Sequence, residues 1–150
     1  MKRPVSPVLA CLLAITLVGA ACSKSSSSTA SASASAGGGE SSSTITLNGQ
    51  SANDHGSKDA SGGGQFEVEV DSFYFNPTVF TGHAGDKLTL TLNNESSTLH
   101  NFSLPDQNLD KDISSNGTVT VNVTLPASGT LVFFCKYHQS QGMVGALEVE

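Results

Sequence analysis

The sequence predicts an all-β protein whose folded part, residues 65–150, is a Greek-key β-sandwich of about seven to eight short strands. The first observation behind this prediction is that apolar residues in this part recur at every second position, the period of a strand with one buried face. The second is that Gly, Asn and Pro residues separate these runs at short intervals, as they do at tight turns. The third is that no segment in this part shows a helical period.

Six runs of residues have the pattern expected of strands. The alternation is clearest in three runs, at residues 66–71, 88–93 and 118–125. Further strand-like runs lie at residues 99–104, 131–135 and 144–149. The expected turns lie at Asn76-Pro77, residues 82–86, Asn93-Asn94, Asn116-Gly117 and residues 126–129. Residues 105–115 form the longest irregular stretch, which could hold a helical turn.

Residues 1–22 have the layout of a secretory signal peptide. Lys2 and Arg3 precede an apolar run that ends in Gly19-Ala20-Ala21-Cys22. The run is shorter than the stretch of about 18 apolar residues that a spanning helix needs. A cysteine directly after small residues resembles the lipobox of bacterial lipoproteins, in which the cysteine is acylated. We therefore expect export and lipidation at Cys22, with cleavage after Ala21 and no lipid as the alternative.

Residues 23–64 consist mainly of Ser, Ala and Gly. Such a segment has few side chains to bury, so burial cannot compensate the entropy lost on ordering. We expect a flexible linker here, with His55 solvated instead of binding a metal.

The net charge of −6 limits the classes of partner. An acidic protein repels the phosphate backbone of nucleic acids, which are therefore excluded as partners. A basic protein surface is the natural counterpart, because opposite charges speed encounter. The simpler alternative is that the acidic residues only keep the domain soluble.

Four residues supply the chemistry of the expected site. Cys135, His138 and Met143 share one short loop, and His100 lies in an upstream strand. One thiolate, two imidazoles and a thioether are the ligands of a mononuclear blue-copper centre. Soft sulfur suits Cu(I) and imidazole suits both oxidation states, so the set fits an ion that cycles between Cu(I) and Cu(II).

The segments around these residues resemble plastocyanin and related cupredoxins over nearly all of residues 66–149. The resemblance is carried by Phe73-Tyr74-Phe75-Asn76-Pro77, Gly85-Asp86, Leu99-His100-Asn101-Phe102 and the ending from Phe133 to Gly145. It implies a cupredoxin-like fold with one copper ion, held by His100, Cys135, His138 and Met143. It also implies that Asn101 ties the ligand loops together. Phe134 and Tyr137 differ from the tyrosine and proline that plastocyanins usually have there, which argues against photosynthetic partners.

The cysteine count supports this interpretation. Cys11 and Cys22 belong to the expected leader, so Cys135 is the one thiol of the exported domain and has no partner for a disulfide. A free thiol outside the cell is prone to oxidation, and a bound copper ion would protect it. His83 lies in an expected turn, and we interpret it as a surface residue, with a second metal contact as the alternative.

These observations predict a monomeric one-electron carrier at the outer face of a bacterial membrane. Its donor and acceptor would be redox proteins. A copper storage protein or chaperone of the cell envelope is the alternative, because the same ligands would serve it. We expect no enzyme: only one cysteine lies in the loop, and no orienting acid accompanies Cys135 and His138 as a hydrolase would require.

Overall fold

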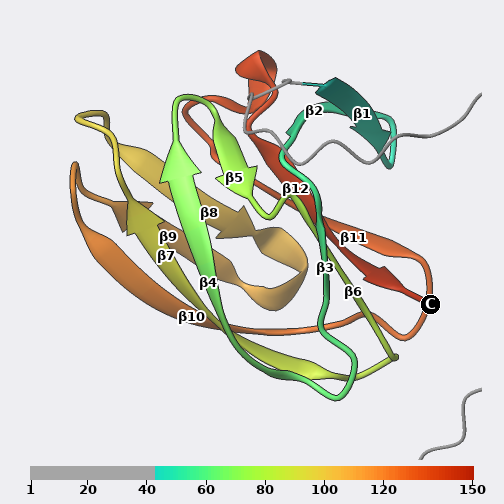
Figure 1. Ribbon diagram of the computed structural model, residues 1–150. Helices are drawn as coiled ribbons and strands as arrows, with labels where there is room; N and C mark the ends of the chain where they lie inside the picture. Colours follow the sequence, from blue (N-terminus) through green and yellow to red (C-terminus); the bar gives the residue numbers. More distant parts are fainter. Residues whose placement is uncertain (1–42) are drawn as a thin grey trace, which may run out of the picture. The chain divides into compact units, whose positions relative to one another are not determined.

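The computed structural model describes residues 43–150, which form a β-sandwich (Figure 1). The expected leader with Cys22, and the first part of the expected linker, residues 23–42, lie outside the described residues. The all-β prediction is confirmed. Between residues 43 and 150, no helix has the length and apolar character needed to cross a bilayer.

The first sheet has four strands in the order β10-β7-β4-β5. Its strands are β4 (Gly64–Asp71), β5 (Tyr74–Asn76), β7 (Lys87–Asn94) and β10 (Thr118–Thr124). Strands β4 and β7 run parallel, and the other pairs are antiparallel. Three of the strands coincide with the runs in which the sequence alternates most clearly.

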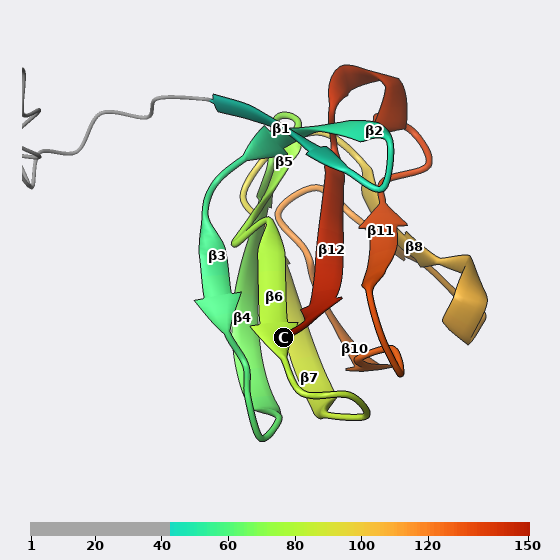
Figure 2. The same ribbon diagram turned by 90° about the vertical axis from the view of Figure 1, so that its right-hand side faces the viewer.

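The second sheet has six strands in the order β3-β6-β12-β11-β8-β9. They are β3 (Ser57–Asp59), β6 (Val79–Gly82), β8 (His100–Leu104), β9 (Leu109–Ile113), β11 (Thr130–Phe134) and β12 (Val144–Val149). Figure 2 shows β3, β6, β12, β11 and β8 of this sheet side by side across the view, with the first sheet behind them. Strand β11 positions the expected ligand loop, because the chain enters that loop directly after it.

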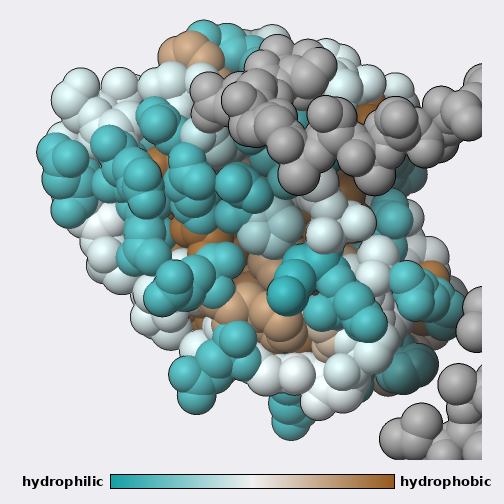
Figure 3. Space-filling view, in the orientation of Figure 1, coloured by the Kyte–Doolittle hydropathy of each residue, from teal (hydrophilic) through white to brown (hydrophobic). Residues whose placement is uncertain are grey.

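The core lies between the two sheets and follows the predicted alternation. Leu88, Leu90 and Leu92 on β7 are at most 1% exposed, whereas the polar residues between them face outward in part. The same core cluster contains an aromatic group made of Phe75, Phe80, Phe102 and Phe133, all fully buried. Burial of each such side chain contributes about 1.5–3 kcal/mol to the free energy of unfolding. The surface in Figure 3 is mostly hydrophilic, with apolar residues showing near its centre and at a few smaller places towards its edges.

The expectation of a flexible linker is wrong for residues 43–64. Strands β1 (Ser43–Leu47) and β2 (Gln50–Asp54) form a hairpin, and β3 adds to the edge of the second sheet. The turn at Asn48-Gly49 has positive φ at both residues, which is typical of a two-residue hairpin loop. We call β1 and β2 the N-terminal hairpin.

The N-terminal hairpin folds because the sandwich offers it an apolar outer face. Leu47 and Ala52 of the hairpin pack against Val79, Val144 and Ala146, which point away from the main core. A segment with few apolar residues can therefore order itself against a surface that is already formed. Figures 1 and 2 both show the hairpin at the end of the sandwich where the loop after β11 lies.

The strands number more than the seven to eight expected, because short edge strands join the longer ones. Residues 105–115 begin with a 3₁₀ turn, Pro105–Gln107, so the expected helical turn is present. The rest of that stretch is not irregular: β9 pairs with β8 along its whole length. The sequence of β9, Leu-Asp-Lys-Asp-Ile, has no apolar alternation, so the pattern of the sequence does not indicate a strand there.

Candidate metal centre

The loop after β11 places its residues at the end of the core. Phe133 and Cys135 lie two positions apart and both point inward, and each is fully buried. The chain then turns through a 3₁₀ segment, Gln139–Gln141, and returns at Met143. The amide of Cys135 donates to the carbonyl of Met143 (3.0 Å), and this bond closes the loop. We call residues 135–143 the ligand loop.

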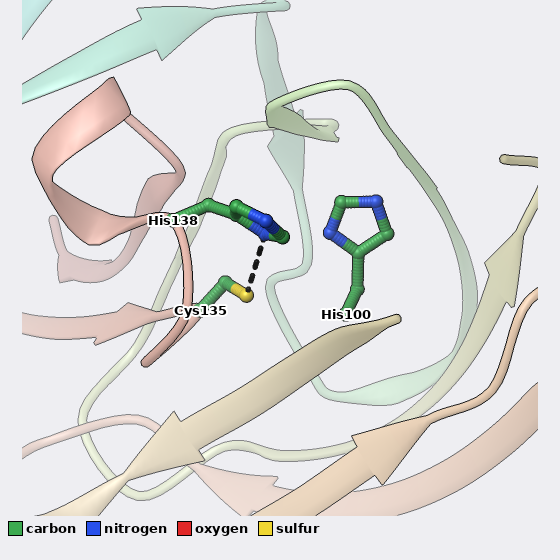
Figure 4. A group of neighbouring side chains, drawn as sticks. All are labelled: His100, Cys135 and His138. Carbon is green, nitrogen blue, oxygen red and sulfur yellow. Dashed lines mark hydrogen bonds between the residues drawn. The ribbon is translucent and has the colours of Figure 1, made fainter. Parts of the chain in front are cut away.

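The structure brings three of the four expected ligands together. His100 enters from the start of β8, and the ligand atoms of His100, Cys135 and His138 all lie within 4.8 Å of one another (Figure 4). Cys135 Sγ and His138 Nδ1 are 3.4 Å apart. Met143 is fully buried in the core cluster that contains Cys135, and its amide donates to the His138 carbonyl (3.2 Å).

The two ring nitrogens of His100 have opposite surroundings. Nε2 lies 3.0 Å from the Ser96 hydroxyl, and that hydroxyl in turn donates to Asn94 Oδ1 (2.9 Å). With the Ser96 hydroxyl donating to Asn94 Oδ1, its oxygen can accept a hydrogen bond from an Nε2–H group, and in that tautomer Nδ1 carries a lone pair. Nδ1 is buried and has no hydrogen-bond partner among the described residues. An unpaired buried polar atom costs about 1–3 kcal/mol, and a metal ion would satisfy it.

The electrostatics of the site favour neutral imidazoles. Burial lowers the pKa of His100, and the neighbouring His138 lowers it further. Burial also lowers the pKa of His138. A neutral imidazole is the form that binds a metal ion, so neither histidine has to lose a proton near neutral pH.

The thiol behaves differently, because burial raises the pKa of Cys135. The backbone N–H groups of Tyr137, Asn101 and His138 act against this and lower the pKa. Hydrogen bonding of this kind would stabilise a thiolate. A metal ion that binds thiolate displaces the proton outright, so the thiolate forms when the ion binds.

Phe73 packs beside both imidazole rings. Its ring centre lies 4.6 Å from that of His138 and 6.4 Å from that of His100. The two imidazole rings are 4.9 Å apart, centre to centre. Beneath them the rings of Phe102 and Phe133 stack at 4.9 Å. The ligand atoms therefore sit in a largely apolar pocket with one partly exposed member, His138.

A model of the cupredoxin-like domain matches residues 11–146. The chain belongs to the cupredoxin-like domain family. A search of curated protein sequences finds no significant match. The resemblance inferred from the sequence is thus confirmed at the level of the family, and the His100–Cys135–His138 group fits a single copper site.

Solved structures show the same fold at low sequence identity. The metal-binding domain of the Cu(I)-exporting P-type ATPase CopA of Streptococcus pneumoniae D39, with Cu(I), has a TM-score of 0.53 and 13% identity over 64% of this chain and 97% of its own. Auracyanin A, a blue copper protein of Chloroflexus aurantiacus, has a TM-score of 0.50 and 22% identity over 59% and 100%. A copper-binding protein in its apo form has a TM-score of 0.50 and 19% identity over 62% and 96%.

Asn101 joins the two cupredoxin segments that carry the candidate ligands. It is fully buried, and its Oδ1 accepts from the amide of Lys136 (3.4 Å) and from the hydroxyl of Ser103 (2.5 Å). Its Nδ2 donates to Asp110 (2.7 Å) and Asp112 (3.0 Å) on β9. Asn101 therefore connects β8, β9 and the start of the ligand loop.

Sequence reasoning missed several residues around this cupredoxin site. Lys136 pairs with Asp110 and Asp112 at 2.7 and 2.9 Å, and the two carboxylates raise the pKa of its ammonium group. Ser96 was not singled out, although a hydroxyl four positions before a candidate ligand is a usable signal. Asn53 was assigned to the linker, and no local pattern could have placed it beside the ligand loop.

The two remaining histidines lie apart from the site. His83 is exposed and sits 3.6 Å from Asp86. His55 stacks on Tyr74 at 3.6 Å between ring centres. Within residues 43–150, the one group of three or more His, Cys or acidic side chains close enough to share an ion is His100, Cys135 and His138.

Proposed function

We propose that the protein holds one copper ion through His100, Cys135, His138 and Met143 and works as a one-electron carrier. The observation that carries the proposal is the close group of two imidazoles and a thiol, in which the buried His100 Nδ1 has no hydrogen-bond partner among the described residues. Met143 completes the set as the weak thioether ligand that such centres use. Copper, when bound, supplies the exchange of a single electron between Cu(I) and Cu(II).

The protein's own residues would keep the ligand geometry fixed while the charge changes. Ser96 orients His100, and Asn101 holds the start of the ligand loop. Phe73, Phe102 and Phe133 exclude water from the pocket. A dry and rigid surrounding favours electron exchange, because few groups have to move when the charge changes.

Burial of the sulfur ligands favours a carrier over a copper chaperone. Cys135 and Met143 are both fully buried, so a competing protein cannot reach either sulfur directly. A chaperone must pass its ion from ligand to ligand and needs exposed sulfur for this step. Copper storage or transfer remains the alternative that the experiment below separates.

A redox partner would meet the protein at the end that carries the site. Leu99 and Tyr137 are the large apolar residues that stand out as exposed in the described part, at 45% and 43%. Each directly precedes a candidate ligand, His100 or His138. The acidic residues Asp110 and Asp112 lie nearby, so a partner with a basic surface would approach this end fastest.

We further propose that the protein works at the outer face of a bacterial membrane, held by a lipid on Cys22. The basic start, the short apolar run and the small residues before Cys22 support this location. Expression in a bacterial host followed by membrane fractionation tests it. We expect the protein in the membrane fraction, and the variant Cys22→Ser in the soluble exported fraction.

The copper proposal is tested by adding Cu(II) to the purified protein. We expect one equivalent to bind with an intense visible absorption band from the thiolate–copper bond. Cys135→Ser should lose that band completely, whereas Cys22→Ser should keep it and serves as the matched thiol control. A Cys135→Ser protein that stays equally coloured would refute the ligand assignment.

A competing chelator then separates the carrier from the copper-handling alternative. A carrier should retain copper in both oxidation states and exchange electrons rapidly with a small redox reagent. Fast loss of the ion in the Cu(I) state alone would instead support copper transfer.

A further inference from the structure

The N-terminal hairpin reaches the ligand loop through one residue, Asn53 of β2. The Asn53 side-chain amide donates to the carbonyl of Gln141 (2.9 Å) and to that of Phe73 (3.0 Å). Its backbone amide donates to the carbonyl of Gly142 (2.9 Å). Asn53 and Gln141 are 88 positions apart in the sequence. Asn53 therefore contacts both the ligand loop and the backbone of Phe73, whose ring packs beside His138.

The bonds from Asn53 differ in kind from those inside the ligand loop. Within the loop, the amide of Gln141 donates to the His138 carbonyl (2.9 Å), and the amide of Met143 donates to the same carbonyl (3.2 Å). These bonds close the loop onto itself. The bonds from Asn53 instead join the loop to another element, so they fix where the loop lies relative to Phe73.

The contact between Asn53 and the loop is close. Gly142 has a left-handed backbone, with φ of 87°, and a Cβ there would lie 2.8 Å from Asn53 Oδ1 and 3.0 Å from its Nδ2. The amide therefore packs directly on the turn between two candidate ligands. A side chain at position 142 would force the hairpin and the loop apart.

The N-terminal hairpin is itself held firmly, so Asn53 acts from a fixed position. The buried Thr78 lies beside the end of β2: its hydroxyl accepts from the amide of His55 (2.7 Å) and lies within hydrogen-bond distance of the carbonyls of Phe75 (2.9 Å) and Asn53 (3.1 Å). The Thr78 amide donates to the carbonyl of Gly56 (2.9 Å). Together with the buried Leu47 and Ala52, these bonds fasten the hairpin to the sandwich.

We propose that Asn53 is a positioning residue of the metal centre. It holds the turn between His138 and Met143, and the backbone that carries Phe73, in one arrangement. In this way it sets the geometry in which copper is bound and the rate at which copper is lost. The proposal deepens the proposed function and rests on it, although its structural part can be measured without copper.

The test uses two variants of the full chain. Asn53→Ala removes the side-chain amide, and Asn53→Asp keeps its shape but cannot donate to the two carbonyls. Asn122→Ala is the matched control, because it also removes an amide with a side-chain hydrogen bond, with Thr89 (2.8 Å), but at an exposed position of β10 in the four-stranded sheet. All three variants should fold, which circular dichroism checks.

Hydrogen exchange of the copper-free protein gives the first measurement. We expect the amides of residues 139–143 to exchange about tenfold faster in both Asn53 variants, the loss expected for one to two hydrogen bonds, and at the unchanged rate in Asn122→Ala. The second measurement is made on the copper form. We expect about tenfold faster copper loss to a chelator and altered copper hyperfine splitting in the paramagnetic resonance spectrum, again in the Asn53 variants alone.

The outcomes separate the two proposals. Unchanged exchange in residues 139–143 overturns the positioning role, whatever the copper does. Faster exchange with an unchanged resonance spectrum and an unchanged rate of copper loss also overturns it, because Asn53 would then stabilise the loop without affecting the site. If the unsubstituted protein takes up no copper, the proposed function fails, and the exchange data still decide whether Asn53 holds the loop.

Discussion

The two histidines of the candidate centre face each other, but their surroundings differ. His100 begins a strand, is fully buried and has its Nε2 fixed by Ser96. His138 lies in a loop, is partly exposed and is covered on one side by the ring of Phe73. One side of the centre is therefore part of the sheet, whereas the other side depends on contacts that distant segments make with the loop.

Removing each imidazole should have the largest effect and should distinguish the two sides. We expect His100→Gly and His138→Gly both to lose the thiolate–copper band. Free imidazole should restore the band in His138→Gly, because the vacated position opens to solvent. It should fail to do so in His100→Gly, where the vacated position is enclosed. A titration with imidazole followed by visible absorption measures this, and equal rescue of both variants would contradict the comparison.

Ser96→Ala should sharpen the comparison on the buried side. The variant removes the group that orients His100, and loss of such a partner typically lowers metal affinity by about 10- to 100-fold. Competition with a chelator of known affinity measures the change. Ser97→Ala is the control, because Ser97 is the exposed neighbour. Equal affinities for the two variants would show that packing alone fixes the ring.

A smaller effect is expected at Asp86, between β6 and β7. The backbone N–H groups of Gly62 and His83 donate to its carboxylate (2.9 Å each) and lower its pKa. A lowered pKa in the folded state means that the ionised carboxylate stabilises the fold. This stabilisation is complete above the ordinary carboxyl pKa of about 3.9 and is lost as the pH falls through the lowered value.

Asp86→Asn should therefore melt at a slightly lower temperature than the unsubstituted protein at about pH 7. The difference should shrink as the pH falls below the ordinary carboxyl pKa of about 3.9 and on through the lowered pKa of Asp86. Thermal melting at several pH values measures it, and the copper spectrum should not change, because Asp86 lies outside the centre. A difference that grows towards low pH would contradict the assigned role of the carboxylate.

The sandwich and the site could both be predicted from the sequence, but each prediction rests on a different kind of pattern. The strands β4, β7 and β10 show themselves by alternation, because one of their faces is buried along the whole length. The spacing of Cys135, His138 and Met143 confines them to one short loop, whatever the rest of the fold does. These are local properties, and local patterns reveal them.

The features that escaped prediction depend on contacts between distant segments. The N-terminal hairpin has only a few apolar residues, and they are buried because β12 offers Val144 and Ala146 on its outer face. Asn53 contacts the ligand loop across 88 positions. The edge strand β9 is charged and is held by pairing with β8. None of these contacts leaves a periodic signal in the sequence.

Strand β11 contributes side chains to both faces of its sheet, and this has a consequence for proteolysis. Phe133 points toward the centre, whereas Val132 and Phe134 point outward and pack beneath the N-terminal hairpin. A protease that cut the chain just before β3 would release the N-terminal hairpin. The apolar residues beneath it, Val132 and Phe134 among them, would then be exposed to solvent. Trimmed molecules should therefore associate through these residues and precipitate.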